Sequence, residues 1–269
     1  MVFNEKRRKK RRKMGWRWGT VMRIWKSSGN RRITGFLTAM GKLLLLGVRV
    51  LIFLVREVDL DALRQVKKKG MAELDELDHK KVEYETFNKN FYDEHEEIKN
   101  LTEAQVATLK ADFEVKTIGS MVPRPVVAFG HLNIDEAMIA KFAKQGYEKP
   151  TPIQATALPC VLSGRDVIGI AKTGSGKTLA YVLPLIIHIL DQRELKKKEG
   201  PVGVILCPTR ELSQQVYLEA KRYARIYNIT VAALLGGENK HDQWKELRAG
   251  VEILVATPGR LIDMYRKKA

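Results

Sequence analysis

The sequence predicts an α/β protein in which a parallel β-sheet is covered by helices on both faces. Beyond about residue 123, short apolar runs rich in β-branched residues alternate with stretches whose apolar residues recur at helical spacing. Apolar runs without polar alternation are typical of strands buried on both faces, as parallel sheets require. We therefore expect consecutive βαβ units. The hydrophobic fraction, 45% of 269 residues, is ordinary for a folded globular protein.

The elements of this sheet are predicted in chain order. The expected strands are Val167 to Ile170, Val202 to Cys207, Thr230 to Leu235 and Glu252 to Ala256. The expected helices between them are Thr178 to Asp191, Glu211 to Tyr227 and Asp242 to Arg248. Pro184 lies inside the first of these helices and should bend it.

The region before the sheet is expected to divide from it near Pro123. Residues 71–122 are charged and low in glycine, and they include a stretch with helical spacing for which Thr102 is a suitable N-cap. Pro123-Arg124-Pro125 then breaks any helix and is typical of a linker. The predicted organisation is a leader over residues 1–70, a charged extension over 71–122 and the α/β domain over 123–269.

The leader is strongly basic. Residues 1–70 hold 20 Lys and Arg against 4 Asp and Glu, whereas residues 71–269 hold 28 against 27, so 16 of the 17 net positive charges lie in the leader. A basic tail on a nearly neutral body favours a polyanionic partner, either nucleic acid or an anionic membrane. The unbroken basic run from Lys6 to Lys13 is typical of a nuclear-import or RNA-contacting tail, or simply of a solvated chain end.

The leader also contains an apolar stretch, Phe36 to Val55, of roughly membrane-spanning length. Lys42 and Arg49 interrupt it. Each such charge costs about 2.5 to 3.5 kcal/mol near the middle of an inserted helix, and each Leu, Ile, Phe or Val returns about 0.3 to 0.6 kcal/mol. The free energy of insertion is thus near zero, which disfavours a membrane span.

Cysteine and histidine usage indicates neither disulfides nor a zinc-type metal site. Cys160 and Cys207 each sit in an apolar run and are expected to be reduced core residues. The histidines are scattered, with no pair at metal-ligand spacing along the chain. They are His79, His95, His131, His188 and His241.

The strongest functional signal is a P-loop, which runs from Ala171 to Thr178 between a predicted strand and a predicted helix. Its glycines let backbone N–H groups and the helix N-terminus face a phosphate group. Lys177 supplies a positive charge for the β- and γ-phosphates, and Thr178 supplies a hydroxyl for Mg²⁺. The generic pattern has Gly where this chain has Ala171.

A second signal lies just upstream, in the segment from Gly146 to Gln154. Two prolines flank Thr151 and stiffen the backbone, so the amide of Gln154 is expected to be held in a fixed orientation. An amide offers both a donor and an acceptor, which suits one edge of an adenine base. Phe129 lies seventeen residues before Gly146. Alone, the segment would indicate only a rigid turn.

Three further loops each follow an expected strand. They are Pro208-Thr209-Arg210-Glu211-Leu212, Gly236-Gly237 and Thr257-Pro258-Gly259-Arg260. Loops at strand ends and helix starts present backbone N–H groups to phosphates, and Thr and Arg add hydroxyls and charge. Such contacts recognise backbone and shape rather than base identity. Each loop taken singly has a plainer explanation: an internal ion pair, a turn, or a loop before a helix.

The motifs together resemble those of DEAD-box ATP-dependent RNA helicases, in this order along the chain. The resemblance implies a RecA-like P-loop NTPase domain, here the first helicase domain, with ATP and Mg²⁺ as cofactors and RNA as partner. It implies an ATP site at Phe129, Tyr147, Thr151, Gln154, Lys172, Thr173, Gly174, Ser175, Gly176, Lys177 and Thr178, with Lys177 and Thr178 catalytic and Thr178 at the metal. It implies RNA contacts at Pro208, Thr209, Arg210, Gly236, Gly237, Thr257, Pro258, Gly259 and Arg260.

The resemblance covers about Val82 to Ala269 and is specific for a subgroup. The segment from Lys89 to Ile98, followed by Leu101-Thr102, is similar to the one that precedes the core in spliceosomal DEAD-box helicases, notably the one associated with splicing factor 3b. Nuclear localisation, spliceosomal partners and no obligate oligomer are the corresponding expectations. Residues 1–70 match no such pattern, and we expect them to be disordered or to derive from a gene-model artefact.

The family's catalytic Asp-Glu-Ala-Asp motif does not occur in the 269 residues. We therefore expect an incomplete first domain that binds nucleotide without hydrolysing it. Three alternatives stay open at this stage. They are another P-loop NTPase, a non-enzymatic RNA-binding module that acts through its basic tail, and a membrane protein anchored by Phe36 to Val55.

Overall fold

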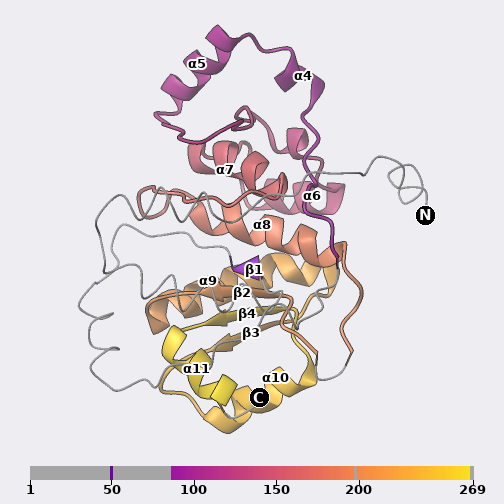
Figure 1. The fold of residues 1–269 in the computed structure, drawn as a ribbon, viewed down its shortest axis with the longest axis vertical. Coiled ribbons are helices and arrows are strands. Elements are labelled where there is room, and N and C mark those ends of the chain that lie inside the picture. The colour runs from indigo at the N-terminus through magenta and orange to yellow at the C-terminus, as the bar shows by residue number, and fades with distance from the viewer. Residues whose placement is uncertain (1–48, 51–85, 197–198, 267–269) are drawn as a thin grey trace. The chain divides into compact units, whose positions relative to one another are not determined.

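A computed structural model of the chain describes residues 49–50, 86–196 and 199–266 (Figure 1). A four-stranded sheet in the order β1-β2-β4-β3 lies at its centre, and every neighbouring pair of strands is parallel. The strands are β1 (Arg49–Val50), β2 (Gly203–Leu206), β3 (Val231–Leu234) and β4 (Ile253–Ala256). The predicted α/β class with a parallel sheet is confirmed, and β2, β3 and β4 fall within three of the four predicted strands.

Helices connect the strands, as the βαβ pattern predicted. The three helices expected from the sequence are confirmed as α8 (Lys177–Leu190), α9 (Arg210–Ala224) and α10 (Lys240–Ala249). The remaining helices are α4 (Glu96–Lys99), α5 (Glu103–Asp112), α6 (Glu136–Lys144), α7 (Pro152–Leu162) and α11 (Pro258–Arg266), with short 3-10 turns η2 (Phe129–Leu132) and η3 (Arg225–Tyr227).

Strand β4 is buried on both faces and separates two hydrophobic clusters. Ile253 and Val255 pack into the larger cluster, which includes residues of α7, α8 and α9. Leu254 and Ala256 point to the opposite face, where they join Met264 of α11 and partly buried residues of α10. Successive side chains alternate across a strand, so one apolar run covers both layers. Helices therefore cover both faces of the sheet, as expected.

Helix α8 is apolar on almost every side because it lies between other elements rather than at the surface. Eleven of its residues are buried, including Leu179, Val182 and Ile186. It packs against α7 on one side and α9 on another (Figure 1). A helix that is hydrophobic all round is stable only when it is enclosed in this way. Its first residue is Lys177, so the core holds the end of the P-loop in place.

The prediction of a strand at Val167 to Ile170 was wrong. The structure has no strand there, and Ile168 and Ile170 are 65% and 72% exposed. Strand β2 pairs with β1 on one side and with β4 on the other, so neither edge of β2 is available to this segment. An apolar, β-branched run forms a strand only when a neighbouring strand satisfies its N–H and C=O groups. Among the described residues no strand does so here.

Residues on both sides of Pro123 contribute to the same core. The Phe91 amide donates to the carbonyl of Leu162 at the end of α7, at 2.7 Å. Tyr92 and Ile98 are buried in the larger cluster. The guanidinium of Arg124 in turn donates to the carbonyl of Ile98 at 3.0 Å. The extension from residue 86 onward thus packs against the α/β domain.

Helix α5 begins where the sequence predicted. Thr102 is its N-cap, and its hydroxyl accepts a hydrogen bond from the Gln105 amide at 3.3 Å, while the Gln105 side chain accepts from the Thr102 amide at 2.8 Å. This reciprocal capping box satisfies two donors that the helix leaves unpaired.

Within the described ranges, no helix is long and apolar enough to cross a membrane. The stretch from Phe36 to Val55 lies outside the described residues except for β1.

Candidate functional site

The P-loop turns tightly ahead of α8, and two glycines make the turn possible. Gly174 and Gly176 have φ angles of 74° and 87°, in the left-handed region that residues with a Cβ rarely adopt. At Gly176 space is also restricted, because a Cβ there would lie 2.4 Å from Nε2 of Gln154. A side chain at Gly176 would therefore push away the residue that holds the loop.

Two side chains at the N-terminus of α7 hold the P-loop. The hydroxyl of Thr151 donates to the carbonyl of Ser175 at 2.8 Å, and Nε2 of Gln154 donates to the carbonyl of Gly176 at 3.0 Å. Oε1 of Gln154 accepts from the Thr151 amide at 3.0 Å, which completes a capping box. Gln154 is only 4% exposed. Its amide is fixed by contacts within the protein, and the same contacts tie α7 to the turn of the P-loop.

Lys177 folds back onto its own loop. Its ammonium group donates to the carbonyls of Ala171 and Lys172, the first at 2.6 Å. The side chain is buried, and the loss of solvation lowers the pKa of Lys177. A phosphate at this turn would offer the ammonium a stronger, charge-assisted partner than a neutral carbonyl.

The hydroxyl of Thr178 is engaged with α9 and with the next turn of α8. Burial raises the pKa of Glu219, and a hydrogen bond with Thr178 lowers it in part. Thr178 also hydrogen-bonds Tyr181, whose pKa is raised by burial. Beside it, Oγ of Ser175 is buried and has no partner among the described residues. The turn thus holds one buried hydroxyl without a partner among the described residues and one that is hydrogen-bonded within the protein.

Two aromatic residues of the predicted ATP site differ in their exposure to solvent. Phe129 is 5% exposed, and its ring centroid is 4.5 Å from that of Phe142. Tyr147 is 40% exposed, with its ring 6.4 Å from that of Phe142. Phe129, the first residue of η2, packs into the core, whereas the ring of Tyr147 is partly exposed to solvent. Of the remaining predicted residues, Lys172, Thr173 and Gly174 are exposed on the turn.

The three predicted RNA loops come together at one edge of the sheet. In chain order the loops follow β2, β3 and β4. These three strands are neighbours in the sheet and parallel, so the carboxyl ends of the strands lie side by side (Figure 1). Thr209 caps α9, where its hydroxyl accepts from the Leu212 amide at 3.3 Å. The Thr257 amide donates to the carbonyl of Leu234 at 3.1 Å, which joins the loop before α11 to the end of β3. Ligand sites in open α/β sheets form at such carboxyl edges.

Glu238, which the sequence interpretation missed, links these loops. Its carboxylate lies 3.3 Å from Nη2 of Arg210 and accepts from Nε2 of Gln243 at 3.0 Å. Its backbone carbonyl accepts from Nη2 of Arg260 at 3.1 Å. Nothing in the local pattern distinguishes an acidic residue after Gly236-Gly237 from an ordinary solvated one. The contacts of Glu238 with Arg210 and Arg260 exist only in the folded chain, where the three loops lie together.

The surfaces of the loops differ in accessibility. Arg210 is exposed, whereas Arg260 is buried and its Nη1 has no partner among the described residues. The accessible positions are those that a polyanion would meet first. Pro208, Thr209 and Gly237 are exposed, and Gly236, Thr257, Pro258 and Gly259 are half-buried.

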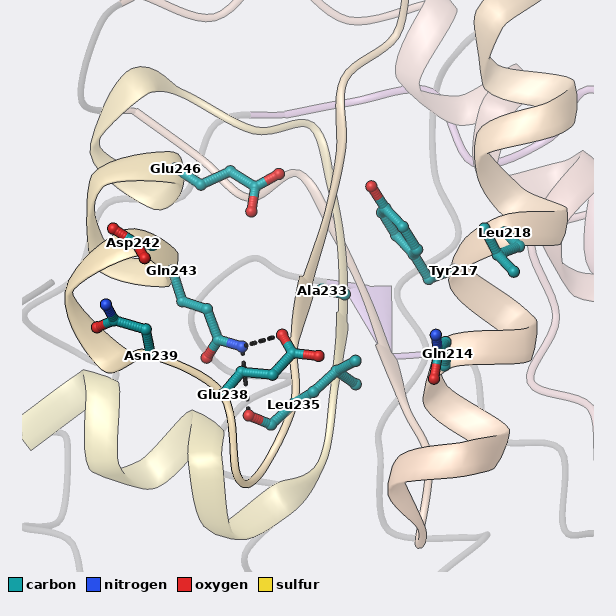
Figure 2. Close-up of a pocket in the computed structure, with 10 residues that line it drawn as sticks. All are labelled: Gln214, Tyr217, Leu218, Ala233, Leu235, Glu238, Asn239, Asp242, Gln243 and Glu246. Carbon is teal, nitrogen blue, oxygen red and sulfur yellow. Dashed lines mark hydrogen bonds between the residues drawn. The ribbon is translucent and has the colours of Figure 1, made fainter.

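A cavity of about 450 Å³ lies between α9 and α10, next to Glu238 (Figure 2). Figure 2 shows Tyr217 and Leu218 on one wall, and Asp242 and Glu246 on the other. Its lining residues carry three carboxyl groups and no Lys or Arg. An acidic lining repels phosphate, so this cavity is not the nucleotide site.

The geometry agrees with comparisons to known proteins. Residues 151–269 match the family model described as DEAD/DEAH box helicase. The matched range begins at Thr151 and includes the P-loop and the three loops at the carboxyl edge of the sheet.

Individual relatives are similar over the same region. The chain is 54% identical over 204 residues to DEAD-box ATP-dependent RNA helicase 24 of rice and 49% identical over 202 residues to human ATP-dependent RNA helicase DDX42. These alignments cover 76% and 75% of this chain but 26% and 22% of the relatives. The chain therefore spans about a quarter of the length of the curated relatives that it matches.

Solved structures show the same fold. The RNA helicase Prp28 from Chaetomium thermophilum, bound to ADP, matches with a TM-score of 0.59 and 39% identity over 64% of this chain and 42% of that one. The yeast DEAD-box splicing factor Prp28 matches with a TM-score of 0.58 and 34% identity over 63% and 41% of the two chains. The architecture is thus part of a DEAD-box RecA-like domain.

Proposed function

We propose that this chain binds ATP at its P-loop and the RNA backbone at the carboxyl edge of its sheet, as part of an ATP-dependent RNA helicase. The observation that carries the proposal is the double contact of Thr151 and Gln154 with the carbonyls of Ser175 and Gly176. It couples a segment suited to adenine to the turn suited to phosphate, so that one ligand can occupy both.

In this proposal different P-loop residues contact different parts of the triphosphate and its metal ion. Lys177 leaves the carbonyls of Ala171 and Lys172 for the β- and γ-phosphates, while backbone N–H groups from Thr173 to Gly176 surround them. Thr178 fits Mg²⁺ because this ion takes oxygen ligands and draws the rest from phosphate and water. When bound, Mg²⁺ neutralises charge that develops on the phosphates.

The proposed RNA contacts are to phosphate and sugar. Arg210 is exposed, and among the residues that the structure describes it pairs with one partly exposed carboxylate, so a phosphate competes for it easily. The N-termini of α9 and α11 present N–H groups at the same edge. Contacts of this kind fix the position of a strand without reading its bases.

The proposed cellular role is remodelling of RNA or RNA–protein complexes in pre-mRNA splicing, in the nucleus, with spliceosomal proteins as partners. It is supported by the similarity to the yeast protein described as a splicing factor and by the segment from Lys89 to Ile98. We further propose that the 269 residues themselves bind ATP without RNA-stimulated hydrolysis, because they contain no Asp-Glu-Ala-Asp sequence to hold the metal and orient water.

Nucleotide titration tests the proposal. Lys177→Ala should weaken ATP binding by about ten- to a hundredfold, since a charge-assisted contact contributes about 1.5 to 3 kcal/mol. Lys144→Ala, which removes an exposed lysine of α6, is the matched control and should leave binding unchanged. A preference for ATP over GTP that disappears in Gln154→Ala would support the adenine assignment. Equal ATP affinity in Lys177→Ala and the wild type would refute the P-loop assignment.

A further inference from the structure

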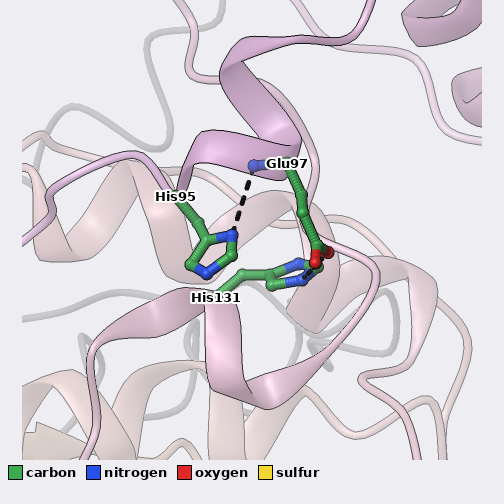
Figure 3. A group of neighbouring side chains, drawn as sticks. All are labelled: His95, Glu97 and His131. Atoms are coloured by element: carbon green, nitrogen blue, oxygen red, sulfur yellow. Dashed lines mark hydrogen bonds and ion pairs between the residues drawn. The ribbon is translucent and has the colours of Figure 1, made fainter.

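A cluster of two histidines and one glutamate lies outside the site described above. His95 is the N-cap of α4, Glu97 is in the first turn of α4, and His131 is in η2 (Figure 3). His131 is 34 residues from Glu97 in sequence, yet one potential ligand atom from each of the three side chains lies within 4.8 Å of the others. Spacing along the chain gave no sign of the cluster, because the fold assembles it.

The geometry of the cluster is close to that of a metal site. Nε2 of His131 is 3.0 Å from Oε2 of Glu97. A tetrahedral ion with bonds of about 2.0 to 2.1 Å holds its ligand atoms about 3.3 Å apart, so this pair already has suitable spacing. The rings of His95 and His131 are stacked with centroids 4.8 Å apart. Three-fold coordination requires the ligand atom of His95, which lies within 4.8 Å of the other two, to move closer to this pair.

Among the described residues, His131 uses only one of its two ring nitrogens, Nε2, which faces Glu97. The residue is 7% exposed, and its Nδ1 has no hydrogen-bond partner among the described residues. Most buried polar groups have a hydrogen-bond partner, so an imidazole with an unpaired Nδ1 is not held by a complete hydrogen-bond network. The side chain of Glu97, in contrast, is 72% exposed, so the cluster is open to ions from solvent.

We propose that His95, Glu97 and His131 bind a divalent transition-metal ion, Zn²⁺ by the chemistry of its ligands, with water in the remaining position. Imidazole nitrogen suits Zn²⁺ and its neighbours in the transition series, whereas Mg²⁺ prefers all-oxygen surroundings. The site is therefore distinct in chemistry from the Mg²⁺ position at Thr178. A bound ion would fasten α4 to η2, the turn that contains Phe129.

The test is a Zn²⁺ titration of the full chain in competition with a chromogenic chelator, in excess Mg²⁺. His95→Asn is the most informative variant, because asparagine also caps helices well and so removes the imidazole while keeping the start of α4. His95→Asn and Glu97→Gln should each weaken Zn²⁺ binding at least tenfold. His241→Asn, which removes an exposed histidine of α10, is the control and should bind as the wild type does.

Two further readouts separate a metal site from a merely structural cluster. Co²⁺ should give the visible absorption of a low-symmetry site in the wild type but not in His95→Asn, and Zn²⁺ should raise the melting temperature only of the former. Zn²⁺ binding that is equally tight in the wild type and in a His95→Asn/Glu97→Gln double variant would overturn the proposal, as would loss of binding in His241→Asn alone.

Discussion

The carboxylate of Glu238 pairs with the guanidinium of Arg210 at 3.3 Å, and the backbone carbonyl of the same Glu238 accepts a hydrogen bond from Arg260. One acidic residue therefore holds the two arginines that we assign to RNA. If Arg210 binds RNA as we propose, a phosphate would compete with this carboxylate for the guanidinium. The pair would then weaken RNA binding.

Glu238→Gln should accordingly strengthen RNA binding by a fewfold. The Arg210–Glu238 pair is partly exposed, and such pairs contribute about 0.2 to 1 kcal/mol, which sets the size of the effect. Fluorescence anisotropy with a single-stranded RNA at two salt concentrations measures it. Glu199→Gln makes the same change in net charge at the Arg193 pair and serves as the control. Weaker binding in Glu238→Gln would mean that the carboxylate orders the loops rather than competing with RNA.

Gln154→Ala should lower both stability and nucleotide affinity. It leaves the Thr151 amide and the Gly176 carbonyl without their partner, and an unpaired buried group costs about 1 to 3 kcal/mol. Gln105→Ala breaks the corresponding capping box of α5, on an exposed surface away from the P-loop. Urea unfolding and ATP titration of both variants distinguish the effects. If Gln105→Ala weakened ATP binding as much as Gln154→Ala, general destabilisation rather than the contact would be responsible.

Glu219 should make the protein less stable as pH rises from the acidic range toward neutrality. Burial raises the pKa of Glu219 above its ordinary value of 4.5. A carboxyl group with a raised pKa in the folded state contributes stability below the unfolded pKa, and that contribution is lost as pH rises through the folded pKa. Glu219→Gln should flatten this decline in denaturant unfolding between pH 4 and pH 7. Glu148→Gln, at an exposed position, should retain it. An identical pH profile in Glu219→Gln and the wild type would contradict the assignment.

Cys207 and Cys160 should not react with thiol reagents in the native state. Burial raises the pKa of Cys207 to about 11, although a hydrogen bond with Ser213 lowers it in part, and burial also raises the pKa of Cys160. At pH 8 both thiols are protonated and shielded, and the thiolate is the reactive form. A colorimetric disulfide reagent should therefore label them only at the rate of unfolding. Rapid labelling without denaturant would show that the core around β2 opens locally.

Sequence patterns predicted the cap of α5 and most strands because these features depend on residues that are adjacent in the chain. The position of Thr102 before a helical stretch predicted a cap, and an apolar run predicted a strand at Glu252 to Ala256, which the structure forms at Ile253–Ala256. The strand expected at Val167 to Ile170 failed because pairing depends on a neighbour that the local pattern does not reveal. Glu238 and His131 were missed for the same reason, since their partners are distant in sequence.

The burial of β4 on both faces has a consequence for how the protein unfolds. Ile253 and Val255 belong to one hydrophobic cluster, and Leu254 and Ala256 belong to the other, so neither layer can be lost without exposing this strand. Amide hydrogens of β4 should therefore be among the slowest to exchange with deuterium, at a rate set by global opening rather than by local fluctuation. The two layers should behave as a single cooperative unit, because β4, like β2 and β3, contributes residues to both clusters.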